Sequence, residues 1–167
     1  TSAILLALKA INLKKNDIVI VPAINFIAAA NLSKILGAKV YFSDVDKLTG
    51  QMTPSDLLKC LKFNKIRKIK VFFTMHNGGF NNFAREFLKI KRKLKCFIIE
   101  DACHALGANN TEKKNDLVGN CKYSDLTTFS FHPLKTITTG EGGMTTTNNL
   151  NFYKIMRQYR NHGFAET

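Results

Sequence analysis

Short, wholly apolar runs alternate along the chain with longer segments in which apolar residues recur at helical spacing. Runs such as 18–21 and 96–99 are apolar at every position, which is typical of strands covered on both faces. The pattern predicts helices over 3–11, 26–36, 54–63, 82–95 and 151–160, and strands over 18–21, 40–42, 71–74, 96–99, 126–131 and 144–147. Because strands and helices alternate, we predict an α/β fold with a largely parallel central sheet flanked by helices.

Polar side chains follow several of the predicted strands. His76 follows one strand, Asp101 ends another, and a segment from Ser130 to Lys135 ends a third. In open α/β sheets, ligands bind outside the carboxyl ends of the strands. We therefore expect the chemistry of this protein to lie at that edge of the sheet.

Length and composition exclude several classes of protein. Of the 167 residues, 45% are hydrophobic and 22% are charged, which excludes a disordered or collagen-like chain. The longest apolar stretches fall far below the roughly 20 residues that a membrane helix needs, so we predict a soluble protein without a membrane partner. The four cysteines form no Cys-x-x-Cys pair. Neither a disulfide framework nor a metal site is indicated, and we expect a reducing, cytoplasmic location.

The chain has a large excess of positive charge. It contains 25 Lys and Arg against 12 Asp and Glu, a formal net charge of +13, and two basic runs cover 62–70 and 89–95. Such runs can bind the phosphates of nucleic acid. Apolar residues interleave with the lysines, however, and this favours a solvated amphipathic surface. We expect no nucleic-acid partner, and a basic nucleic-acid-binding module is the less favoured alternative.

One segment carries the residues best suited to covalent chemistry. Residues 129–143 read Phe-Ser-Phe-His-Pro-Leu-Lys-Thr-Ile-Thr-Thr-Gly-Glu-Gly-Gly. Lys135 lies shortly after Ser130 and just before a glycine-rich turn, an order that suits a Schiff-base lysine beside a phosphate-binding serine. By spacing alone, a solvated surface lysine is the commoner interpretation.

Residues elsewhere add to this hypothesis. Asp101 follows a buried strand, where an unpartnered carboxylate is costly; the pyridine nitrogen of pyridoxal phosphate would be a partner, and capping of the next turn is the alternative. Thr1 and Ser2 at a helix start can bind a dianionic phosphate, or simply form an N-cap. Phe26 follows a strand and can stack on a planar ring or pack in the core.

Together these segments resemble the DegT/DnrJ/EryC1/StrS family of pyridoxal-phosphate-dependent sugar aminotransferases. The resemblance covers essentially the whole chain. It rests on Thr-Ser-Ala at 1–3, Ile-Val-Pro-Ala-Ile-Asn-Phe at 20–26, Gly-Ala-Lys-Val-Tyr-Phe-Ser-Asp-Val-Asp at 37–46, Glu-Asp-Ala-Cys-His-Ala-Leu-Gly at 100–107, the segment 129–143 and Arg-Asn-His-Gly at 160–163. Segments 101–107 and 132–143 most resemble the branch that aminates UDP-4-keto-6-deoxy-N-acetylhexosamines on the route to pseudaminic acid.

The resemblance implies roles for the matching residues. Lys135 falls on the Schiff-base lysine, Asp101 on the partner of the pyridine nitrogen, and His104 beside the phenolic oxygen of the ring; these are the implied catalytic residues. The implied cofactor-binding residues are Thr1, Ser2, Phe26, Asp101, His104, Ser130 and Lys135. The resemblance assigns no role to His76, His132 and Glu141.

The implied fold is the aspartate-aminotransferase-like fold type I, with residues 1–167 as its large domain, shortened at both ends and lacking the small C-terminal domain. The implied reaction moves an amino group from an amino acid, expected to be glutamate, to the keto carbon of a nucleotide-linked 4-keto-6-deoxy sugar, in a homodimer with pyridoxal 5′-phosphate. A related dehydratase branch has His at the lysine position, so Lys135 favours transamination. An inactive, truncated homologue is the alternative.

Two positions depart from the family pattern. Ala29 stands where many relatives have Thr, and the loop 77–80 reads Asn-Gly-Gly-Phe in place of an aromatic-Gly-Gln sequence. Both lie in segments that are expected to surround the cofactor, so they bear on the preference for donor or sugar.

Overall fold

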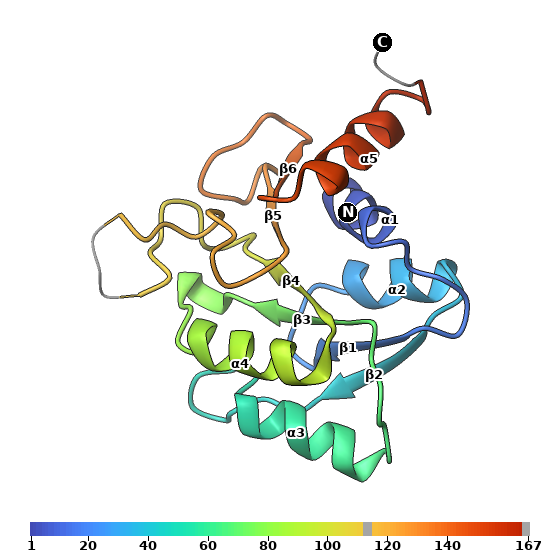
Figure 1. The fold of residues 1–167 in the computed structure, drawn as a ribbon. Coiled ribbons are helices and arrows are strands. Elements are labelled where there is room, and N and C mark those ends of the chain that lie inside the picture. Colours follow the sequence, from blue (N-terminus) through green and yellow to red (C-terminus); the bar gives the residue numbers. More distant parts are fainter. Residues whose placement is uncertain (112–114, 165–167) are drawn as a thin grey trace.

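A central sheet with helices on both faces forms the part of the chain, residues 1–111 and 115–164, that the computed structural model describes (Figure 1). The helices are α1 (Ser2–Ala10), α2 (Ala28–Ile35), α3 (Pro54–Phe63), α4 (Ala84–Leu94) and α5 (Leu150–Arg160), with a 3-10 turn, η1 (Asn77–Gly79). The strands are β1 (Ile18–Pro22), β2 (Lys39–Ser43), β3 (Val71–Met75), β4 (Phe97–Asp101), β5 (Leu126–Ser130) and β6 (Gly143–Thr146). The predicted elements are all present, with bounds that shift by one or two residues.

The strands form one sheet of six, in the order β2-β1-β3-β4-β5-β6. All neighbours are parallel except β5 and β6, which run antiparallel. The prediction of a largely parallel sheet is confirmed. The strand order reverses at β1, because the chain passes from β1 outward to β2 and then back to β3 on the other side. A reversal of this kind leaves a crevice at the carboxyl ends of the strands, where ligands bind.

Alternate residues of the strands enter two separate cores. On β3, Val71 and Phe73 pack into the core beneath α1, α2 and α5, whereas Phe72 packs into the core beneath α3 and α4. All three side chains are fully buried. Burial on both faces explains why the run Val71-Phe72-Phe73 is apolar at every position.

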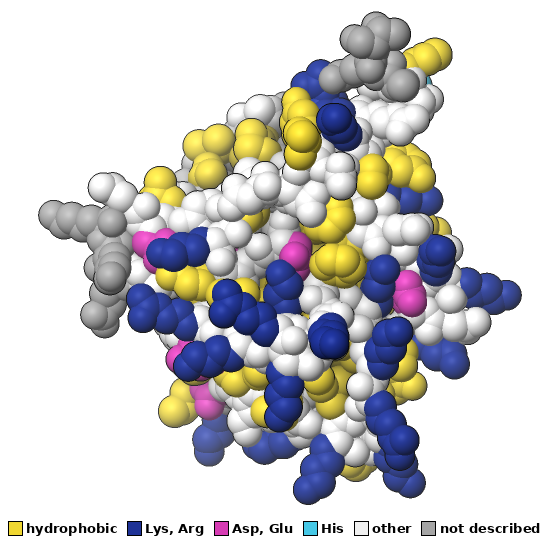
Figure 2. All heavy atoms as spheres, in the orientation of Figure 1, with side chains coloured by type: hydrophobic (Ala, Val, Ile, Leu, Met, Phe, Trp, Pro, Cys, Tyr) yellow, Lys and Arg dark blue, Asp and Glu magenta, His cyan; other side chains and the backbone are white. Residues whose placement is uncertain are grey.

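The basic runs lie largely on the solvent side of α3, α4 and the segments that follow them. On α4, Ala84 and Phe87 are buried, while Lys89, Arg92 and Lys93 are exposed. Figure 2 shows Lys and Arg side chains gathered over these two helices. The arrangement agrees with the amphipathic surface expected from the sequence. Within the described residues, no helix has the length and apolar character needed to cross a membrane.

Candidate active site

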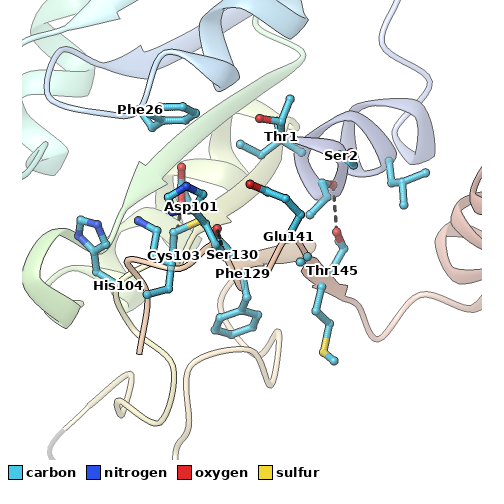
Figure 3. Close-up of a pocket in the computed structure, with 18 of the residues that line it drawn as sticks. Thr1, Ser2, Phe26, Asp101, Cys103, His104, Phe129, Ser130, Glu141 and Thr145 are labelled. Carbon is cyan, nitrogen blue, oxygen red and sulfur yellow. Dashed lines mark hydrogen bonds between the residues drawn. The ribbon is translucent and has the colours of Figure 1, made fainter. Parts of the chain in front are cut away.

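A cavity of about 1060 Å³ opens at the carboxyl ends of β1, β3, β4 and β5. Its wall contains every site residue predicted from the sequence, namely Thr1, Ser2, Phe26, Asp101, His104, Ser130 and Lys135. Figure 3 shows the side chains that come from α1, β4, β5 and the loop after β1 facing this space. The fold therefore brings residues from both ends of the chain into one site.

Asp101 is the last residue of β4 and is only 1% exposed. It lies between its register partners Met75 on β3 and Thr128 on β5. Its Oδ1 accepts a hydrogen bond of 3.2 Å from the backbone N–H of Cys103, so the carboxylate does also cap the following turn. Burial and the negative charge of Asp101 raise the pKa of the Cys103 thiol. A buried carboxylate at a cavity wall is suited to hold a cationic group of a ligand.

Lys135 lies on a hydrogen-bonded loop that joins β5 to β6. The loop closes through a bond of 2.9 Å from Phe131 N–H to Gly142 C=O, and Lys135 N–H donates to His132 C=O at 2.9 Å. A side chain at Gly142 would collide with the hydroxyl of Thr139, so a larger residue there would force Thr139 to move. The half-buried Lys135 is thereby held at the cavity wall.

The N-terminus of α1 forms another part of the wall. Thr1 occupies the N-cap position, but its side chain makes no capping hydrogen bond. The first backbone N–H groups of a helix have no partner within the helix, and the helix dipole makes that end positive. These groups, with the hydroxyls of Thr1 and Ser2, can bind an anion. Thr145 on β6 fixes the helix by donating from Oγ1 to the C=O of Ala3 at 2.9 Å.

Phe26 and His104 lie at the cavity with exposed side chains. Phe26 is 66% exposed, so it is not a core residue, and in Figure 3 its ring lies across the space from Asp101 and Ser130. Partial desolvation at the cavity wall lowers the pKa of His104, and the positive charge of Lys135 lowers it further. His104 is therefore a neutral imidazole near pH 7 and able to donate or accept a hydrogen bond.

This electrostatic coupling predicts a measurable effect on His104. We expect Lys135→Ala to raise the pKa of His104 in the cofactor-free protein, because a positive charge that disfavours the imidazolium is removed. An NMR titration of the histidine ring protons measures it. The matched control is Lys122→Ala, which removes an exposed lysine that pairs with Asp116 and is expected to leave the titration unchanged. An unaltered His104 midpoint in the Lys135 variant would contradict the shared cavity.

Several cavity residues on α5 were not predicted from the sequence. Tyr153, Arg157 and Arg160 all line the wall. Arg157 Nη1 donates to the Tyr153 hydroxyl at 3.0 Å. Their spacing of four and three positions places them on one face of a helix, which is the signal that could have identified them. Glu141, for which no role was implied, also lines the cavity.

Comparison with known proteins gives a consistent set of similarities. The sequence profile of the DegT/DnrJ/EryC1/StrS aminotransferase family matches residues 1–167. The chain is 35% identical to GDP-perosamine synthase of Escherichia coli O157:H7, over 99% of this chain and 43% of that protein. It is 36% identical to the UDP-4-amino-4,6-dideoxy-N-acetyl-beta-L-altrosamine transaminase of Campylobacter jejuni, over 99% of this chain and 42% of that protein.

A solved structure gives the corresponding similarity in three dimensions. The crystal structure of NtdA from Bacillus subtilis with bound cofactor PMP superimposes with a TM-score of 0.83 at 28% identity. The match covers 98% of this chain and 35% of NtdA. The chain thus spans less than half the length of these relatives.

Proposed function

The chain belongs to the DegT/DnrJ/EryC1/StrS aminotransferase family, and from this premise we propose that it is the pyridoxal-phosphate-binding part of a nucleotide-sugar aminotransferase. One observation carries the proposal: the Lys135 amine, the Asp101 carboxylate and the uncapped N-terminus of α1 line a single cavity. The proposed donor is an amino acid, glutamate by analogy with the family. The proposed acceptor is the keto carbon of a nucleotide-linked 4-keto-6-deoxy sugar.

The groups of the cavity match those of pyridoxal 5′-phosphate. The N-terminus of α1, with Thr1, Ser2 and Ser130, suits the phosphate. Asp101 suits the protonated pyridine nitrogen, and Phe26 suits the face of the ring. When bound, this cofactor supplies an electron sink for bond cleavage at the carbon that carries the amino group. The cavity volume of about 1060 Å³ also leaves room for a sugar.

The residues of the chain perform separate tasks in this proposal. The Lys135 amine would hold the cofactor covalently at its aldehyde carbon, and its Nζ would serve as the proton carrier. The buried Asp101 carboxylate would keep the proton on the ring nitrogen. His104, as a neutral imidazole, would hydrogen-bond beside the phenolic oxygen. These roles require the residues to face one space, and all three side chains line the same cavity.

The nucleotide part of the acceptor agrees with the charge of the cavity. Arg157 and Arg160 of α5 line it, and guanidinium groups suit a diphosphate. The relatives of this chain include proteins named for GDP-linked and UDP-linked sugars.

The proposed homodimer and location agree with further side chains. Exposed apolar side chains near the cavity, such as Ile24 and Leu134, suit coverage by a second copy in a homodimer. The cysteines Cys60, Cys96, Cys103 and Cys121 are all free, which suits the cytoplasm.

The test uses the purified protein, pyridoxal phosphate, glutamate and a UDP-linked 4-keto-6-deoxy-N-acetylhexosamine. We expect an amino sugar and 2-oxoglutarate, both detected by mass spectrometry. Borohydride treatment is expected to fix the cofactor on Lys135. Fixation on Lys135 without amino transfer would support the inactive homologue instead. Fixation on a different lysine would contradict the proposal.

A further inference from the structure

A buried polar cluster lies on the side of the sheet opposite the cavity, and the proposed reaction does not use it. Glu100 is 4% exposed and His76 is 1% exposed. His76 Nε2 lies 3.6 Å from Glu100 Oε1, an ion-pair distance when the imidazole is protonated. Glu100 Oε2 accepts hydrogen bonds from Ser124 Oγ at 2.8 Å and from Thr127 Oγ1 at 2.5 Å. Each carboxylate oxygen thus faces a polar partner.

These partners keep the buried carboxylate ionised. Burial on its own would raise the pKa of Glu100, but His76 and the hydroxyls of Thr127 and Ser124 outweigh that effect and lower the pKa below its usual value. An ionised, buried group that is bonded on several sides has a fixed position, because any movement would leave charge uncompensated.

The cluster is connected to Asp101 through the backbone. Neighbouring residues of a strand point to opposite faces, so Glu100 faces the cluster while Asp101 faces the cavity. The backbone N–H of His76 donates to the C=O of Asp101 at 3.0 Å. His76 therefore contacts Glu100 with its ring and Asp101 with its main chain.

Hydrogen bonds from β5 hold the other side of the same segment. Thr128 Oγ1 donates to the C=O of Glu100 at 3.1 Å, and the N–H of Ala102 donates to the C=O of Thr128 at 2.9 Å. The peptide groups on both sides of Asp101 are thus bonded to neighbouring segments. These bonds fix the backbone at Asp101, and the backbone in turn sets the direction of the Asp101 side chain.

We propose that Glu100 and His76 are positioning residues that hold the Asp101 carboxylate in place for the ring nitrogen of the cofactor. This inference rests on the proposed function, since it assumes that Asp101 faces that nitrogen. Loss of either side chain leaves a buried polar atom of the other without the group that now faces it. The end of β4 and the start of the loop at His76 then shift, and Asp101 shifts with them.

The main test is Glu100→Gln in the purified protein. The amide has nearly the same size, but it lacks the charge and replaces one acceptor oxygen with a donor. By analogy with residues that orient ligands from behind a binding site, we expect the Kd for pyridoxal phosphate to rise about tenfold. We also expect the absorption maximum of the bound cofactor to shift, because a displaced carboxylate holds the ring proton less well. In the cofactor-free protein, the amides of His76 and Ala102 are expected to exchange faster with deuterium.

Two further variants separate a positioning role from a general loss of stability. His76→Gln is expected to have the same effects, and the double variant is expected to be no worse than the poorer single variant, because both remove one interaction. Thr127→Val removes a single hydroxyl and is expected to raise the Kd by a smaller factor. These variants decide the question if Glu100→Gln does not fold.

Asp125→Asn is the matched control. Asp125 accepts hydrogen bonds from Lys91 Nζ at 2.7 Å and from Ile98 N–H at 2.8 Å. It therefore stabilises β4 as Glu100 does, but nearer the amino end of the strand. This variant is expected to unfold more easily while the Kd and the cofactor spectrum stay unchanged. An equal rise in Kd for the control would overturn the positioning role.

Asp101→Asn distinguishes failure of the inference from failure of the proposed function. If it weakens cofactor binding while the Glu100 and His76 variants leave the Kd, spectrum and exchange unchanged, the positioning role is wrong and the proposed function stands. If Asp101→Asn itself leaves cofactor binding and the spectrum unchanged, the proposed function is wrong.

Discussion

Replacement of Lys135 by Ala is expected to abolish covalent capture of pyridoxal phosphate and to lower the rate of amino transfer at least about a thousandfold, since it removes both the proposed nucleophile and the proposed proton carrier. The amine comes from the closed loop between β5 and β6 and lines the cavity together with Asp101. The measurements are the mass of the borohydride-treated protein and the single-turnover rate with glutamate.

Two comparisons make this result specific to the amine of Lys135. Lys135→Arg keeps the positive charge but cannot form the covalent bond, so we expect it to be as inactive as the alanine variant. Lys93→Ala removes an exposed lysine of α4 and is expected to behave like the unmodified protein. Covalent capture that persists in Lys135→Ala would refute the assignment of this lysine.

Replacement of Asp101 by Asn is expected to have the second largest effect, a fall in the amino-transfer rate of about a hundredfold. A hydrogen bond to a charged group contributes about 1.5–3 kcal/mol, and about 1.4 kcal/mol corresponds to each tenfold change. Because Asp101 is only 1% exposed, little solvent screens this interaction. The rate is measured at saturating cofactor, so that weaker binding does not contribute.

The fold of the Asp101→Asn variant is expected to remain intact. The side-chain oxygen of Asn can still accept the hydrogen bond from Cys103 N–H, so cofactor-free thermal unfolding should change little. Asp17→Asn is the control, because Asp17 precedes β1 at the opposite edge of the sheet and accepts from Lys14 N–H at 2.9 Å. A rate within twofold of the unmodified protein would show that Asp101 does not act on the ring nitrogen.

The sequence was sufficient to predict β1, β3 and β4 because burial on both faces makes most of their positions apolar. Phe72 and Phe73 are both fully buried although they point to opposite sides of the sheet. Asp101 was predicted as a site residue because it ends a buried strand, where a carboxylate without a polar or charged partner is energetically unfavourable. Parallel pairing then brings it to the same edge of the sheet as Ser130.

Features that depend on pairing between distant segments could not be predicted in this way. The antiparallel direction of β6 follows from its contact with β5, and an isolated run of Met144 and threonines does not specify direction. The pairing of His76 with Glu100 depends on the register of β3 against β4. The residues of α5 reach the cavity because this helix packs on α1, and the sequence alone does not specify that packing.

The hydrogen bond between Thr145 and Ala3 joins residues 142 positions apart. During synthesis on the ribosome, α1 leaves the exit tunnel long before its partner strand exists. The N-terminal end of α1 therefore cannot be fixed against the loop that carries Lys135 until the hairpin formed by β5 and β6 has also emerged. A nascent chain that stops before this hairpin contains neither Lys135 nor Thr145, so we expect the proposed cofactor site to form only late in synthesis.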